Sequence, residues 1–173
     1  MSVDKRVALA SLGARVIITP NAPPSSPENF RNVAKRLAEE HGWFLTDQFN
    51  NPANVRVHEE TTGAEILAQT GGSVGAFVAG AGTGGTLSGV GRRLKAASPN
   101  VRVVLADPVG SGLADWVETG RLGADGSYAV EGIGASEVDD LATHGVRYVV
   151  LADARGTEDP LVASLDSQRG LRR

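Results

Sequence analysis

The sequence predicts an α/β fold, a parallel sheet with helices on both faces. Strand and helix patterns alternate along the chain, which is typical of this class. The apolar runs Ala76–Ala79 and Val101–Ala106 show no alternation of apolar and polar residues, as expected of parallel strands that are covered on both faces. A glycine-rich segment, Gly80–Thr86, directly follows the first of these runs and opens a helix.

The first part of the chain predicts two helices and two short strands. Ser2 is a good N-cap, and Gly13 stands where the first helix would end. Ser26 is expected to cap a second helix that has Pro27 in its first turn and ends at Gly42. A run rich in β-branched or aromatic residues follows each helix. These runs predict strands over 14–19 and 43–45.

The rest of the chain predicts longer helices and further strands. Gln48–Asn54 is too polar, and too broken by proline, to form a regular element. Helices are expected from about Val55 to Thr70 and from the glycine-rich segment to about Ala97. Towards the end of the chain, the strand candidates are 128–130 and 146–151.

Composition excludes several classes of function. The chain has 173 residues, which suffices for a hydrophobic core without disulfides or metals. It has no cysteine, so a disulfide framework, a thiol nucleophile and a cysteine-based zinc site are excluded. A net charge of −3 gives no reason to expect nucleic acid or an anionic membrane surface as a partner. Charged residues follow Met1, and no apolar run approaches the roughly 20 residues that cross a bilayer. A cytoplasmic location is therefore expected.

The segment Gly80–Thr86, here called the glycine loop, predicts a phosphate site. Glycines let backbone N–H groups approach an anion closely, and the following helix start adds unpaired donors and a positive dipole end. The hydroxyls of Thr83 and Thr86 can complete such a cradle. The alternative without a ligand is a tight turn between strand and helix.

A dinucleotide-binding module is a further alternative. Gly80-x-Gly82-x-x-Gly85 satisfies the dinucleotide fingerprint, and Asp107 closes the next strand about 20 residues further on, where a ribose-binding acid is expected. The extra Gly84 and the two threonines fit a single phosphate group better than a pyrophosphate. Gly71–Gly75 matches Gly-x-Ser-x-Gly but lies between a helix and a strand, so Ser73 is interpreted as a loop residue. The three histidines lack metal-binding spacing and are interpreted as surface or helix-end residues: His41, His58 and His144.

Four motifs together resemble a known family. In chain order they are Gln48-Phe49-Asn50-Asn51-Pro52-Ala53-Asn54, Thr61-Thr62-Gly63-Ala64-Glu65-Ile66, the glycine loop and Val130-Glu131-Gly132-Ile133-Gly134. They resemble the pyridoxal-phosphate β-replacement family of cysteine synthase and cystathionine β-synthase, transferases and lyases of cysteine biosynthesis. The resemblance implies part of the tryptophan synthase β-like architecture, fold type II. It covers residues 1–138, about four fifths of the chain, and leaves 139–173 as a divergent C-terminal segment.

The resemblance implies a role for each matching residue. Gln48 would bind the carboxylate of an amino-acid substrate, and Phe49 would line the same pocket. Gly132 and Gly134 would let the backbone approach cofactor and substrate. The alternatives are a polar loop amide for Gln48 and an ordinary turn for Gly132. The residues implied to hold the cofactor phosphate are Gly82, Thr83, Gly84, Gly85 and Thr86.

The family's Schiff-base lysine has no counterpart here. The chain has three lysines, Lys5, Lys35 and Lys95, and none stands in the family's Ser-x-Lys setting. The resemblance therefore implies a truncated or split enzyme that holds pyridoxal phosphate by its phosphate end, without covalent attachment, and is inactive alone. Expected partners are a complementing N-terminal half or full-length homologue, and a second copy of the chain. The alternatives are a non-catalytic regulatory protein that docks on full-length relatives, and a nicotinamide-binding module.

Overall fold

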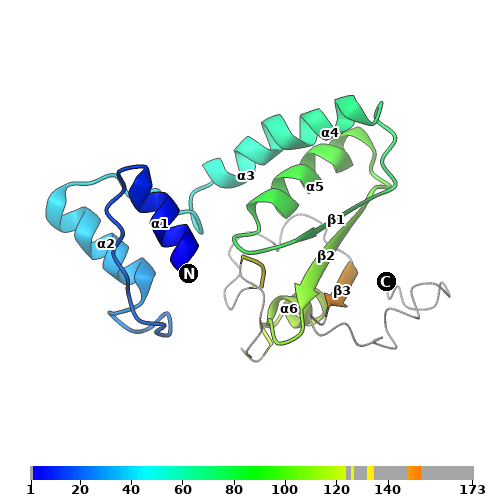
Figure 1. Ribbon diagram of the computed structural model, residues 1–173. Helices are drawn as coiled ribbons and strands as arrows, with labels where there is room; N and C mark the ends of the chain where they lie inside the picture. Colours follow the sequence, from blue (N-terminus) through cyan, green and yellow to red (C-terminus); the bar gives the residue numbers. More distant parts are fainter. Residues whose placement is uncertain (1, 124–125, 127–131, 135–147, 153–173) are drawn as a thin grey trace. The chain divides into compact units, whose positions relative to one another are not determined.

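The computed structural model describes residues 2–123, 126, 132–134 and 148–152. It divides the chain into two compact units, Met1–Asp47 and Gln48–Arg173, shown in Figure 1. The first unit contains two helices, and the second contains the sheet and the glycine loop.

The first unit is built on α1 (Val3–Ser11) and α2 (Phe30–His41). The prediction of two helices is confirmed, including the left-handed Gly42 that ends α2. The predicted start of α2 is wrong, because its N-cap is Asn29 rather than Ser26. The Asn29 side chain accepts a hydrogen bond from the backbone N–H of Arg31 and donates one to the carbonyl of Ala22. An amide side chain that joins the helix start to the preceding loop is thus the better cap.

The two strands predicted for this unit are absent from it. Residues 14–19 and 43–45 have irregular backbone, and most of their apolar side chains are exposed, with Ile18 at 52% and Phe44 at 85%. β-Branched and aromatic residues favour a strand only where a neighbouring strand can pair with them and a layer can cover them. Within the described part of this unit no such neighbouring strand is present, so these residues form no strand despite their β propensity.

The second unit begins with a nearly continuous run of helix, here called the helical arm. It consists of α3 (Ala53–Val57), the π-helical turn η1 (His58–Thr62) and α4 (Gly63–Gln69). The helix predicted from Val55 to Thr70 is confirmed, although it starts within the segment predicted to be irregular. In η1 the N–H of Gly63 donates to the carbonyl of His58, five residues back, which widens the helix at this turn.

A three-stranded parallel sheet follows, in the order β1-β2-β3. The element order is β1 (Ala76–Gly80), α5 (Gly85–Ala97), β2 (Arg102–Pro108), α6 (Leu113–Thr119) and β3 (Tyr148–Ala152). In the register Val78 pairs with Val104, and Ala106 pairs with Val150. The predicted parallel α/β class is confirmed, as are the strands at 76–79 and 101–106 and the described part, from residue 148, of the strand expected at 146–151. The candidate at 128–130 lies outside the described residues, and α6 was not predicted.

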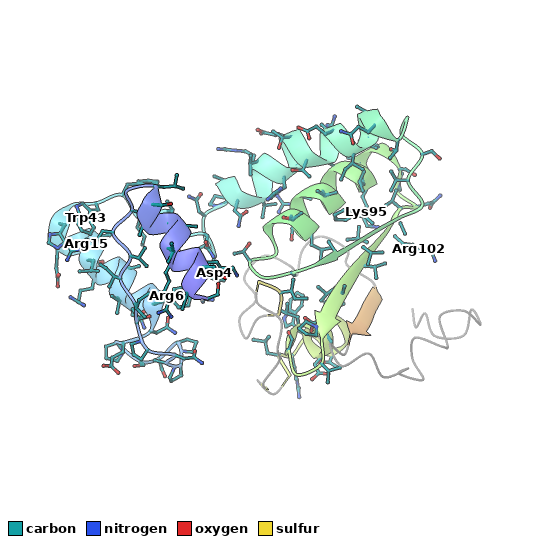
Figure 2. All side chains as sticks on the ribbon, in the orientation of Figure 1. Asp4, Arg6, Arg15, Trp43, Lys95 and Arg102 are labelled. Carbon is teal, nitrogen blue, oxygen red and sulfur yellow. The ribbon has the colours of Figure 1, made fainter. Side chains whose placement is uncertain are left out.

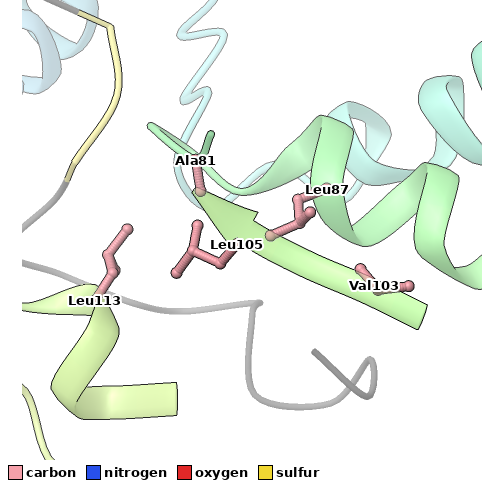
Figure 3. Packing of buried hydrophobic residues seen from close by; sticks show 5 residues of the cluster. All are labelled: Ala81, Leu87, Val103, Leu105 and Leu113. Carbon is pink, nitrogen blue, oxygen red and sulfur yellow. The ribbon is translucent and has the colours of Figure 1, made fainter. Parts of the chain in front are cut away.

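The core lies where α5 packs on one face of the sheet (Figure 3). Leu87 of α5, Val103 and Leu105 of β2 and Leu113 of α6 are all buried and form one cluster with Ala81. A second cluster joins α5 to the helical arm and the start of β2, and its buried members are Val90, Leu94 and Val101.

β1 and β2 differ in how far the side chains on their two faces are buried. In β2 both faces are covered, since Val103 and Val104 are each buried. In β1, Val78 is 57% exposed, so the prediction that both faces of this strand are covered is wrong. β1 is one of the two edge strands of the described sheet, whereas β2 is its central strand. Among the described helices, none is long and apolar enough to cross a membrane.

Candidate functional site

The glycine loop joins the carboxyl end of β1 to the amino end of α5. Gly84 is the N-cap of α5 and has a φ of 80°, a left-handed conformation that glycine adopts without strain. The first turn of a helix leaves N–H groups without intrahelical acceptors and carries the positive end of the helix dipole. Gly84 and Gly85 are buried, whereas Thr86 is exposed. The loop therefore places the first turn of α5, with the exposed Thr86, next to the carboxyl end of β1.

Asn54, at the start of the helical arm, fixes the conformation of this loop. Its Nδ2 lies 2.9 Å from Oγ1 of Thr83 and 2.9 Å from the carbonyl oxygen of Gln48. The N–H of Gly85 also donates to Oγ1 of Thr83, at 3.3 Å. Because this oxygen accepts two hydrogen bonds, the hydroxyl proton of Thr83 remains available to a ligand. Any side chain at Gly85 would collide with the Asn54 amide, which explains the glycine there.

A second contact joins the arm to Thr86. Nε2 of His58 lies 3.2 Å from Oγ1 of Thr86, and Nδ1 of the same ring lies 3.0 Å from Oγ1 of Thr62. His58 is the C-cap of α3 and is half-buried, which agrees with its interpretation as a helix-end residue, and its ring also contacts Thr86 of the glycine loop, which was not predicted. The i,i+4 spacing of His58 and Thr62 was the available signal. In the part of the chain that the structure describes, no group of three acidic or histidine side chains could hold a metal.

The predicted glycines at positions 132 and 134 lie against the glycine loop. The N–H of Gly134 donates to the carbonyl oxygen of Ala81 at 2.8 Å. A Cβ on Gly82 would stand 2.8 Å from the carbonyl oxygen of Gly132, which is closer than side chains tolerate. Gly132 and Gly134 have φ values of 92° and 83°. The structure thus brings together two motifs that are about 50 residues apart in the sequence.

Gln48 and Phe49 stand in a turn that leads into the helical arm. Gln48 is exposed, and its carbonyl oxygen accepts a hydrogen bond from Nδ2 of Asn54, which donates a second one to Oγ1 of Thr83. Phe49 is half-buried. Both residues therefore belong to the same cluster of segments as the glycine loop. Asn54, which joins them, stands in the predicted motif but was assigned no role.

Asp107 has a structural partner at the end of β2. Its side chain is completely buried, and Oδ2 accepts a hydrogen bond from the N–H of Ala114 in α6 at 2.9 Å. Burial raises the pKa of this carboxyl group, while hydrogen bonds from the Ser111 side chain and the Ala114 backbone oppose the rise. The nearby charge of Asp115 raises the pKa further. A carboxylate enclosed in this way caps α6 and is not presented to a ribose.

Lys95 stands at the far end of α5 from the glycine loop (Figure 2). Its Nζ donates to the carbonyl oxygen of Val101 at 3.0 Å, which ties the amine to the turn before β2. The other two lysines, Lys5 and Lys35, belong to the Met1–Asp47 unit. Ser73, as predicted, lies in the exposed loop between α4 and β1.

Comparisons with known proteins agree with the family that the sequence motifs resemble. A family model described as "Pyridoxal-phosphate dependent enzyme" matches residues 1–158. The chain is 46% identical over 132 residues to cysteine synthase 2 of Neurospora crassa, covering 70% of this chain and 29% of that protein. It is 43% identical over 136 residues to cysteine synthase of Staphylococcus aureus, covering 78% of this chain and 41% of that protein.

Among solved structures, the O-acetylserine-dependent cystathionine β-synthase of Helicobacter pylori superposes with a TM-score of 0.76 and 31% identity. The superposition covers 88% of this chain and 47% of that structure. The chain therefore spans less than half the length of each of these three proteins, and it matches them over most of its own length.

Proposed function

The chain belongs to the family of pyridoxal-phosphate-dependent enzymes, and we propose that its glycine loop holds the phosphate of that cofactor in a truncated or split cysteine synthase-like protein. The observation that carries the proposal is the convergence of Gly82–Thr86 on the amino end of α5. A cytoplasmic location, expected from the sequence, is part of the proposal.

The residues of the loop fit a phosphate group. The left-handed Gly84 and the close approach of Gly82 to Gly132 leave no room for side chains where the backbone would face the anion. The hydroxyls of Thr83 and Thr86 add two donors beside the N–H groups of the first turn of α5. When bound, pyridoxal phosphate supplies an electron sink for negative charge that develops on an amino-acid substrate.

The neighbouring segments would bind the substrate. We assign the substrate carboxylate to Gln48, whose backbone is fixed to the glycine loop through Asn54. Phe49 would line the same pocket. Gly132 and Gly134 would let the backbone approach the cofactor, as their left-handed conformations and contacts with Ala81 and Gly82 favour. The parent reaction is amino-acid β-replacement, in which a sulfur nucleophile replaces a leaving group on a serine derivative.

The chain alone is proposed to be inactive. The covalent step needs a lysine amine held within bonding distance of the cofactor aldehyde. Lys95 is committed to the carbonyl of Val101, at the opposite end of α5 from the phosphate loop. A complementing polypeptide that supplies the lysine, either an N-terminal half or a full-length homologue, would be required.

The phosphate site is tested by titrating inorganic phosphate into the labelled chain and following backbone amide shifts. We expect saturable shifts centred on Gly82–Thr86 at millimolar phosphate or below. Gly84→Val should abolish them, because it strains a left-handed position and fills the anion site. Gly75→Ala is the matched control, since a Cβ there meets nothing within 4 Å. Shifts confined to other regions, or none, would refute the site.

The split-enzyme proposal is tested separately. The chain is incubated with pyridoxal phosphate, reduced with borohydride and mapped by peptide mass, and turnover of O-acetylserine and sulfide is assayed in parallel. We expect no stoichiometric label and no turnover. Turnover that appears when a lysine-bearing N-terminal half is added would support complementation. Stoichiometric label on one lysine together with turnover by the chain alone would refute the proposal.

One observation favours a second candidate, a non-catalytic protein that docks on a full-length relative. The Met1–Asp47 unit exposes large apolar side chains, among them Ile18 and Phe44. Co-purification of this chain with an intact cysteine synthase, without any gain of turnover, would favour docking over complementation. The nicotinamide alternative is disfavoured, because the acid at its expected ribose position is the buried cap Asp107.

A further inference from the structure

We infer that His58 is a positioning residue for the bound anion: it directs the hydroxyl proton of Thr86 towards the phosphate through a chain of hydrogen bonds that begins at Thr62. The inference rests on the proposed phosphate site and assigns that site a partner outside the glycine loop. Its basis is the placement of one imidazole ring between two hydroxyl groups.

The distances define the chain of hydrogen bonds. Nδ1 of His58 lies 3.0 Å from Oγ1 of Thr62, and Nε2 lies 3.2 Å from Oγ1 of Thr86. Both ring nitrogens therefore have a hydroxyl partner. Thr62 and His58 are half-buried, whereas Thr86 is exposed at the second residue of α5. This series of hydrogen bonds thus leads from a half-buried hydroxyl of the helical arm to the exposed hydroxyl beside which an anion would bind.

The local backbone makes this placement possible. His58 opens the π-helical turn η1, and α5 passes close to it at Gly89, three residues after Thr86 on the same side of the helix. A Cβ on Gly89 would stand 2.8 Å from both the Cβ of His58 and the N–H nitrogen of Glu59. Glycine at this position therefore lets the two helices approach until the ring reaches Thr86.

The direction of the hydrogen bonds determines what Thr86 offers. In a neutral imidazole one ring nitrogen donates and the other accepts. If Nε2 carries the proton, it donates to Oγ1 of Thr86, and the Thr86 hydroxyl proton is released for an anion. Nδ1 then accepts from the hydroxyl of Thr62. If Nδ1 carries the proton, every bond reverses, and the hydroxyl of Thr86 donates to the ring instead of the ligand.

The unprotonated oxygens of a phosphate at the glycine loop accept hydrogen bonds and have no proton to donate. It therefore favours the arrangement in which Nε2 is protonated. By linkage, residues that favour this tautomer strengthen anion binding by the same factor. In this tautomer Nδ1 is an acceptor, and the hydroxyl of Thr62, 3.0 Å away, is the group that can donate to it. Thr62 should thus influence phosphate affinity although it lies outside the glycine loop.

The tautomer gives a readout that a purely structural role would not move. Long-range proton–nitrogen spectra of the imidazole distinguish protonated from unprotonated ring nitrogens. We expect phosphate, added at pH 8, to shift His58 towards the form that is protonated at Nε2. The affinity itself is measured by the phosphate titration described above.

Matched variants distinguish the loss of these hydrogen bonds from a general loss of stability as the cause of weaker phosphate binding. Thr62→Val should weaken phosphate binding roughly three- to ten-fold, the effect of one net hydrogen bond. Thr61→Val is the control, because the Thr61 hydroxyl donates to the carbonyl of Val57 in the same turn. His58→Phe should weaken binding at least as much. His58→Gln, whose amide can still donate towards Thr86, should restore part of the affinity.

The possible outcomes distinguish a failure of the proposed phosphate site from a failure of the role inferred for His58. If the unmodified chain shows no phosphate-dependent amide shifts, the proposed site itself fails, and the inference fails with it. If it binds phosphate, but Thr62→Val binds as tightly as Thr61→Val and the His58 tautomer does not change, the inference alone is overturned. Should His58→Phe fail to fold, the two threonine variants and the tautomer spectra still decide.

Discussion

Asn54 donates a hydrogen bond of 2.9 Å to the hydroxyl oxygen of Thr83, so that the first turn of the helical arm holds the loop that precedes α5. The same amide nitrogen reaches the carbonyl oxygen of Gln48. One side chain therefore connects the proposed phosphate loop and the proposed substrate segment. This connection makes Asn54 a residue on which both proposed sites depend.

Replacing Asn54 should impair both stability and anion binding. Asn54→Ala removes the donor to Thr83 and to Gln48, and we expect a loss of about 1–2 kcal/mol in the free energy of unfolding. Phosphate affinity should fall several-fold, because the Thr83 hydroxyl is no longer held in place. Urea unfolding and phosphate titration measure the two effects. Asn100→Ala, in the exposed turn after α5, is the control and should change neither. Equal phosphate affinity in both variants would contradict the assigned role.

The elements around the glycine loop could be predicted because their signals are local. An apolar run, a cluster of glycines and a helical pattern follow one another between residues 76 and 97, and the structure has β1, the loop and α5 in those places. The failures have a different cause. The strands expected at 14–19 and 43–45 depend on pairing partners that are not encoded in the segments themselves.

Among the residues of the candidate site, too, those with a local sequence signal could be predicted, and those whose contacts depend on packing could not. The glycines of the loop were identified because their chemistry follows from the residue type and its position after a strand. The contact of Asn54 with Thr83 and that of His58 with Thr86 join positions 28 or more residues apart. Both contacts depend on how the helical arm packs on α5. Within the dinucleotide-binding alternative, spacing alone places Asp107 at a ribose. Spacing gave its position at the strand end correctly but could not show that α6 would enclose it.

Alanine substitutions at two glycines of α5 should have different effects. A Cβ on Gly89 would overlap the carbonyl oxygen of Val55 and crowd His58, whereas a Cβ on Gly91 would make contacts of 3.3–3.9 Å with the Val103 side chain. We expect Gly89→Ala to cost roughly 2–3 kcal/mol of unfolding free energy, because it forces the helices apart. Gly91→Ala should be nearly neutral, since gain in helix propensity offsets the tighter contact. Urea unfolding of the pair provides the test, and equal stability of the two variants would show that the close helix approach is unimportant.

The buried carboxyl of Asp107 should make stability depend on pH. Burial raises its pKa in the folded state above the unfolded value of roughly 3.9. The folded chain therefore binds a proton more tightly than the unfolded chain, and the contribution of Asp107 to stability declines as pH rises from the unfolded pKa through the folded one. Below this window the contribution is fully present.

Asp107→Asn should remove this dependence. The difference in unfolding free energy between the parent chain and the variant is expected to fall with rising pH across that window and then level off. Urea unfolding at a series of pH values measures it. Glu65→Gln, at an exposed position of α4, is the control. A difference that is independent of pH would mean that the carboxyl is solvated or fully compensated in the folded state.

The isolated chain should associate with itself. Leu12 and Phe44 are each 85% exposed, and Ile18 and Trp43 are also exposed. Exposed apolar side chains in this number favour association. We expect light scattering to give a mass above that of one chain, and a hydrophobic dye to bind. Phe44→Ser combined with Ile18→Ser should reduce both signals, whereas a clean monomer without dye binding would contradict the expectation.

The π-helical turn at His58–Thr62 makes the length of the helical arm as important as its composition. An α-helix advances about 100° per residue, so a regular helix over the same residues would rotate His58 and α4 relative to each other, whereas the π-helical turn absorbs one residue within a single wider turn. Either the histidine would leave Thr86 or Gly63 would leave Arg93, which its missing side chain now accommodates. A homologue with one residue fewer in this stretch can keep both contacts with a regular helix, so insertions and deletions here are more informative than substitutions.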